Sequence, residues 1–135
     1  MDASGHRWTG ATIPASHRDL ADCPPVAALS TLTRDGYPQT SVVWCDFDGV
    51  FVRVNTMRGF AKERNMRRDP RVTLLCYDPR RPLRYLEVRG TVVQMTEVGA
   101  AAHLDELSSK YAGRTSGATM PTSTDPAAPP SETIR

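Results

Sequence analysis

The segment best suited to chemistry is 58–71, RGFAKERNMRRDPR, which lies between two predicted strands. On a helix, Arg58, Lys62 and Asn65 follow intervals of four and three residues and therefore share one face. A guanidinium, an ammonium and an amide beside a helix N-terminus are suited to binding a phosphate or carboxylate. The same spacing also fits a solvated basic helix with Glu63 and Asp69 in surface ion pairs, so the residues alone leave both interpretations open.

Positive charge is concentrated in one part of the chain. The 135 residues carry a net charge of +2, yet the range 58–89 holds ten Lys or Arg against four Asp or Glu. This distribution favours a local anionic partner over general nucleic-acid binding. A nucleic-acid-binding barrel is a further alternative because of the arginines, but the candidate strands lack the aromatic ladder on which such barrels stack bases.

The sequence shows no nucleophilic triad, no paired carboxylates at a suggestive spacing and no metal-binding cluster. The three histidines are scattered, and we expect each at the surface or at a helix cap. The three cysteines have neither CxxC spacing nor a nearby histidine pair, so we expect buried free thiols rather than a disulfide or a zinc site. No apolar run is long enough to cross a bilayer and the first residues lack a secretory apolar region, so we expect a cytoplasmic protein.

The elements that position the basic segment follow from periodicity and turn residues. A short helix begins at Ser16, and a second helix, capped by Asn55 or Thr56, is expected to end before Asp69-Pro70. A third helix is predicted over 96–113, and strands are predicted over 26–32, 37–47, 50–56, 71–77 and 83–95. Short links between the first three strands require an antiparallel meander. These elements predict a small, mainly β barrel or rolled sheet.

The predicted domain organisation has three parts. Residues 1–12 form a flexible leader, 13–113 form the β domain, and 114–135 form a Pro-, Ser- and Thr-rich tail that we expect to be disordered.

Five stretches, in order and spacing, resemble the pyridoxamine-phosphate-oxidase-like split β-barrel family. They are IPASHRDL, VAALSTLTRDGYPQTSVVW, VRVNT, AKERNMRRDPRVTLL and RYLEVRGTV, within residues 13–113. They are most similar to the branch of flavin/deazaflavin oxidoreductases that use coenzyme F420. The resemblance implies an FMN-binding split β-barrel with Greek-key-like topology and two or three helices. It also implies a homodimer with the cofactor at the subunit interface. Relatives usually continue into a final strand; here we expect that strand to be missing, which leaves a sheet edge unpaired.

The resemblance also implies a set of cofactor-binding residues. Lys62 matches the lysine that contacts phosphate in the family, and Asn65 matches a polar residue of the same helix. Relatives often have a cation where Phe60 stands, and Arg58 is expected to substitute for it. Three other segments are expected to contact the cofactor: one along its tricyclic ring, one at the end of the following strand, and one after the 78–82 turn. Their residues are Gln39, Thr40, Ser41, Val42, Val54, Asn55, Thr56, Arg84 and Tyr85.

For several of these residues, a structural role is an open alternative. Gln39 and Ser41 also fit ordinary strand polarity, and Arg84 and Tyr85, expected to reach the cofactor across a dimer, also fit plain surface roles. Trp44 is expected either to line the substrate side of the pocket or to pack in the core or the dimer interface.

The function implied is hydride transfer from reduced F420 to an unsaturated small molecule, with the chemistry supplied by the cofactor. An FMN-dependent oxidoreductase of the same fold is the first alternative, because both cofactors carry phosphate. The acidic oligoglutamate tail of F420 would suit surplus cations at Arg58, Arg64, Arg80 and Arg81. A non-catalytic flavin- or deazaflavin-binding protein is the other alternative, favoured by the missing strand. The substrate is not readable from the chain.

Overall fold

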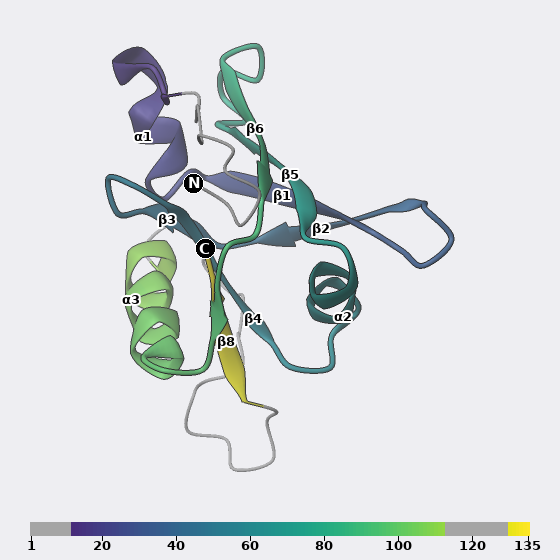
Figure 1. Ribbon diagram of the computed structural model, residues 1–135. Coiled ribbons are helices and arrows are strands. Elements are labelled where there is room, and N and C mark those ends of the chain that lie inside the picture. The colour runs from purple at the N-terminus through teal and green to yellow at the C-terminus, as the bar shows by residue number, and fades with distance from the viewer. Residues whose placement is uncertain (1–11, 113–129) are drawn as a thin grey trace.

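The computed structural model describes residues 12–112 and 130–135 (Figure 1). The helical elements are η1 (Ala15–His17), α1 (Arg18–Ala21), α2 (Ala61–Arg68) and α3 (Ala100–Ala112). The strands are β1 (Val26–Leu32), β2 (Pro38–Val43), β3 (Cys45–Phe47), β4 (Val52–Met57), β5 (Arg71–Tyr77), β6 (Tyr85–Thr91), β7 (Met95–Thr96) and β8 (Ser131–Ile134). Among the described residues, no helix has the length and apolar character needed to cross a bilayer.

The eight strands form two four-stranded sheets, with orders β2-β1-β5-β6 and β3-β4-β8-β7. Every pairing is antiparallel. Only Trp44 separates β2 from β3, and residues 92–94 separate β6 from β7, so the chain passes directly from one sheet to the other at both edges. The architecture is a split β-barrel joined by bent strands, not a closed barrel, and the predicted fold class is confirmed.

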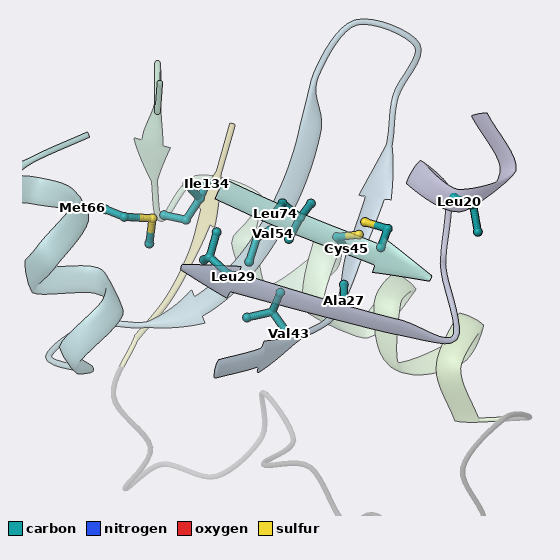
Figure 2. Packing of buried hydrophobic residues seen from close by; sticks show 10 residues of the cluster. Leu20, Ala27, Leu29, Val43, Cys45, Val54, Met66, Leu74 and Ile134 are labelled. Atoms are coloured by element: carbon teal, nitrogen blue, oxygen red, sulfur yellow. The ribbon is translucent and has the colours of Figure 1, made fainter. Parts of the chain in front are cut away.

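Alternation along the strands places the core between the sheets. In β1 the buried positions are Ala27, Leu29 and Thr31, which is the period of two expected when one face is covered. Figure 2 shows Leu29, Leu74 and the C-terminal Ile134 converging from different strands of both sheets. Burial of such apolar side chains is the main force that holds the sheets together.

The prediction that the last strand is missing is wrong. Residues Ser131–Ile134 form β8, which pairs with β4 on one side and β7 on the other, so the expected open edge is filled. The predicted disorder of 114–135 is therefore wrong for 131–134. Residues 113–129 of that tail, and 1–11 of the predicted leader, lie outside the described residues. The sequence SETI contains one large apolar residue, so its strand forms because two neighbouring edges satisfy its backbone, not because of a hydrophobic pattern.

The basic helix begins later than predicted. Asn55 and Thr56, the expected caps, belong to β4, and α2 starts only at Ala61 after a turn at Gly59 with φ of +84°. Glycine adopts this left-handed conformation without steric cost, which allows the sharp change from strand to helix. The predicted end is confirmed, because α2 stops at Arg68 immediately before Asp69-Pro70.

Candidate cofactor site

Helix α2 is anchored to the barrel by its apolar and amide side chains. Met66 is 2% exposed and packs in the main core cluster, where Figure 2 shows it reaching in from α2. Asn65 is also buried, and its Nδ2 donates to the Thr31 hydroxyl of β1 at 3.0 Å. The opposite side of the helix is left to face solvent, as its amphipathic pattern requires.

Internal carboxylates already neutralise two cations of this segment. Arg58 forms an ion pair with Glu97 at 2.7 Å, and its Nε lies 3.4 Å from Glu132 Oε1. Arg67 donates both to Glu63, one turn earlier, and to Glu132 of β8. Glu63 and Glu132 are 3% and 2% exposed, so these pairs are partly shielded from water. Arg58 is therefore committed within the chain, which weakens its predicted role as a substitute cation.

Other arginines of the segment also have acceptors. Arg64 donates to the Gly59 carbonyl, and Arg68 donates to the Leu32 carbonyl at 2.9 Å. Arg71 forms an exposed ion pair with Asp69 at 2.7 Å. Arg64, Arg68 and Arg71 therefore have partners within the chain, as Arg58 and Arg67 do.

Lys62 differs from every other cation in 58–71. Its ammonium has neither a hydrogen bond nor an ion pair within the described part of the chain, although the side chain is half-buried. Burial lowers the pKa of Lys62 below its usual value, because a charged amine loses hydration there. An anion placed beside it would restore that lost stabilisation.

The N-terminus of α2 lies next to Lys62 and has no side-chain cap. Phe60 occupies the N-cap position and offers no hydrogen-bond acceptor to the first helical N–H groups. Glu63 reaches back only to the Gly59 N–H, at 3.1 Å. A half-buried ammonium beside uncapped N–H groups is a suitable environment for a phosphate.

A chain of hydrogen bonds connects α2 to the predicted ring-binding strand. The Thr31 hydroxyl accepts from Asn65 and donates to Gln39 Oε1 of β2 at 3.1 Å. Asn65 Oδ1 in turn accepts from Arg68 at 3.0 Å. The structure thus brings Gln39 and Asn65 together through a residue, Thr31, that sequence reasoning missed. Thr31 has no distinguishing signal in the sequence, because it occupies an ordinary inward position of β1.

The remaining β2 residues point to alternate faces. The Thr40 hydroxyl lies 2.7 Å from that of Ser30, and Val42 is 70% exposed on the same outward face of the sheet. Ser41 points the other way, and its Oγ is buried with no hydrogen-bond partner among the described residues. A buried unsatisfied hydroxyl costs free energy, which makes Ser41 Oγ a candidate contact for a ligand.

The β4 residues predicted to meet the cofactor have different surroundings. Val54 belongs to the main core cluster, and Thr56 is buried opposite Glu132 of β8. Asn55 Nδ2 donates to the Ala100 carbonyl at the start of α3, at 2.9 Å, and its Oδ1 is buried and unsatisfied. The structure therefore places Val54 in the core and buries Thr56 against β8, and it connects Asn55 to α3.

Arg84 and Tyr85 are not brought to α2 within one chain. Tyr85 pairs with Tyr77 at one end of the β5–β6 ladder, whereas Arg71, next to α2, pairs with Thr91 at the other end. Six residues of strand separate the two ends, a distance of about 20 Å. Arg84 is engaged there by Asp19, with a shortest separation of 2.8 Å.

His103 corrects one expectation about the histidines. It is 4% exposed, with Nε2 lying 3.3 Å from Asp46 Oδ1 and Nδ1 lying 3.2 Å from the Thr133 hydroxyl. Arg53 adds two hydrogen bonds to Asp46, at 2.9 and 2.7 Å. The Thr-His-Asp order is that of a nucleophilic triad, but all three side chains are buried, so the network joins α3 to the sheet rather than reaching a substrate.

The aromatic and thiol residues have structural surroundings. Trp44 stacks on Tyr111 of α3, with ring centroids 5.2 Å apart, which favours its packing role. All three cysteines are buried, as predicted, and none forms a disulfide among the described residues. Within the described ranges, no cluster of metal-ligating side chains forms.

These features define a class of protein: a split β-barrel with a basic helix after the fourth strand. A family model for pyridoxamine 5'-phosphate oxidase matches residues 13–135. The chain belongs to that family. The comparison with curated proteins gives no match.

Solved structures support the same assignment. A structure described as an F420 reductase is 30% identical, covers 90% of this chain and 92% of its own, and superposes with a TM-score of 0.76. A conserved hypothetical protein from Mycobacterium tuberculosis is 21% identical with a TM-score of 0.64, covering 96% of this chain and 82% of its own. A NimC/NimA family protein from Clostridium acetobutylicum is 12% identical with a TM-score of 0.59, covering 88% of this chain and 78% of its own. The latter two show the fold alone.

Proposed function

We propose that this protein is an oxidoreductase that binds coenzyme F420 and reduces an unsaturated small molecule. The observation that carries the proposal is Lys62, a half-buried ammonium without an acceptor among the described residues, beside the uncapped N-terminus of α2. The similarity to an F420 reductase at 30% identity favours the deazaflavin over FMN, the alternative cofactor. When bound, the cofactor supplies hydride transfer.

The residues of this chain would bind and orient that cofactor. Lys62 and the first N–H groups of α2 would hold its phosphate, and burial of Lys62 would make the ion pair stronger than an exposed one. Gln39, held by Thr31, would border the ring along β2, where Ser41 Oγ offers an unused hydrogen bond. No acid or base beside this site is required, because solvent would supply the proton that completes the reduction.

Internal pairing limits the number of cations free for the acidic tail of F420. Arg58 and Arg80 are already paired with Glu97 and Asp78. Arg64 donates to a backbone carbonyl. Arg81 makes no side-chain ion pair among the described residues and is exposed, so it is the strongest remaining candidate of the predicted four. This makes phosphate binding at Lys62, rather than recognition of the tail, the principal contribution to affinity.

We further propose that the active form is a homodimer built on the outward face of the sheet β2-β1-β5-β6. The register places Val42, Ala28 and Leu75 in one row across that face, and Tyr77 and Tyr85 pair in the next row. Val42 and Tyr85 are 70% and 55% exposed. A second copy on this face would bury them, and it would bring its own β6 end toward the first copy's site.

Fluorescence titration of the full chain with oxidised F420 and with FMN tests the proposed function. Saturable binding of F420 at lower concentration than FMN is expected. Tighter binding of FMN would assign the alternative cofactor, and no binding of either would refute the proposal. Lys110→Ala is the matched control for Lys62→Ala, because Lys110 is an exposed lysine paired with Asp22 on another part of the surface.

A further inference from the structure

The inward faces of the sheets leave a cavity of about 410 Å³ at one end of the barrel. Its volume lies in the range of small-molecule sites. Six aliphatic side chains from four strands line it: Leu29, Val52, Val54, Val72, Leu74 and Val88. Leu29, Val54 and Leu74 also belong to the main core drawn in Figure 2. The cavity therefore borders the packed core.

Two arginines stand among these apolar walls. Arg18 is exposed and has no hydrogen bond or ion pair from its side chain within the described residues. Arg135 donates from Nη1 to Gln94 at 3.1 Å, while its Nε is buried and has no partner there. A buried guanidinium N–H without an acceptor is costly and marks a place where an anionic oxygen would be stabilised.

The carboxylate of Asp48 does not fill that place. Asp48, in the β3–β4 turn, accepts backbone N–H groups from Val50 and Phe51, at 2.8 and 2.7 Å. The pKa of Asp48 is lowered, first by the Phe51 N–H, with smaller contributions from Arg53 and Arg135. Its oxygens are thus directed to its own turn, and no ion pair with Arg18 or Arg135 forms among the described residues.

We propose that this cavity binds a small apolar molecule with a single carboxylate. Its hydrocarbon portion would contact the valine and leucine walls, and the carboxylate would meet Arg18 and Arg135. A cationic ligand would be repelled by the two guanidiniums, and a fully polar one would lose hydrogen bonds along the aliphatic wall. Each buried methylene would contribute about 0.8 kcal/mol of gross transfer free energy.

This inference does not rest on the proposed function. The cavity wall includes none of Lys62, Asn65 and Gln39, and shares only the core residue Val54 with the predicted cofactor residues. Ligand binding in the barrel and cofactor binding at α2 can therefore succeed or fail separately.

Calorimetric titration of the full chain with octanoate tests the proposal, with octylamine and octanamide as probes of equal length. Saturable binding of octanoate is expected, with octanamide at least tenfold weaker and octylamine without detectable binding. Equal affinity for all three probes would show that the arginines do not select a carboxylate, and would overturn the proposal. Absence of octanoate binding would overturn it as well.

Variants locate the site. Arg135→Gln should weaken octanoate binding roughly tenfold, a loss typical of one charge-assisted hydrogen bond. Arg80→Gln, on an exposed turn, is the matched control and should leave it unchanged. Val88→Phe should fill the cavity and abolish binding while F420 or FMN titration stays as in the parent chain. Octanoate binding that survives both Arg135→Gln and Arg18→Gln would overturn the proposal.

Discussion

Arg67 of α2 donates a hydrogen bond to Glu132 of β8, although the two residues are 65 positions apart in the chain. The same carboxylate oxygen lies 3.4 Å from Arg58 Nε, so the C-terminal strand supplies the counter-charge for both arginines. The other oxygen, Glu132 Oε2, is buried without a partner among the described residues. The C-terminal strand thus fixes the electrostatic balance at the base of the basic helix.

Glu132→Gln should lower the free energy of unfolding by about 1–3 kcal/mol, since it removes a charged acceptor from two arginines. Urea denaturation monitored by tryptophan fluorescence measures the change. Glu87→Gln is the control, because Glu87 pairs with Arg89 on the exposed strand β6 and should have little effect. Equal losses for the two variants would contradict the internal role of Glu132.

Lys62→Ala should weaken F420 or FMN binding about tenfold or more, because it removes the one cation of 58–71 without an acceptor in the described chain. The stability of the variant should change little, since the ammonium makes no hydrogen bond or ion pair with the described residues. The fluorescence titration proposed above gives the affinity, with Lys110→Ala alongside. Unchanged affinity for both cofactors would remove Lys62 from the site.

Asn65→Ala should affect stability and cofactor binding together. It leaves the Thr31 hydroxyl without its donor, so the Thr31–Gln39 hydrogen bond loses its connection to α2. We expect a loss of about 1–3 kcal/mol in unfolding free energy and a smaller loss of cofactor affinity than for Lys62→Ala. Thermal unfolding and titration of the same samples separate the two effects. A stable variant with strongly reduced affinity would instead indicate direct contact between Asn65 and the cofactor.

The Asp46 network should make stability depend on acid pH. Burial raises the pKa of Asp46, but hydrogen bonds from His103 and Arg53 outweigh it and hold the pKa at about 2, below the usual 3.8. Because the folded-state pKa is depressed, this stabilisation is present above about pH 4 and is lost as pH falls from 4 toward 2. This pKa shift corresponds to about 2–3 kcal/mol of stability.

Asp46→Asn tests that dependence by difference, since other carboxylates titrate in the same range. The variant should be less stable than the parent at pH 6, and the difference in unfolding free energy between the two should decrease as pH approaches 2. Urea midpoints at several pH values provide the comparison. A gap that stays constant across this range would show that the charge of Asp46 does not contribute.

Val42→Arg should disrupt the proposed dimer, because it places a charge at the exposed β2 end of the row formed by Val42, Ala28 and Leu75. Light scattering should give twice the 14.9 kDa chain mass for the parent and the single mass for the variant. Val98→Arg, at another exposed valine, is the control. A monomeric parent chain that still binds cofactor would contradict the shared site.

The sequence by itself determined most strands, the end of the basic helix and the candidate role of Lys62. Those features depend on local properties: alternation in 26–32 and 71–77, the Asp69-Pro70 stop, and helical spacing of charge. The tertiary structure decided what each charged residue faces. Glu132 and Thr31 have no local signal of importance, because their roles come from strands paired across long separations. The short strand SETI could not be recognised for the same reason: its hydrogen bonds come from β4 and β7, and neither edge is visible in its own residues.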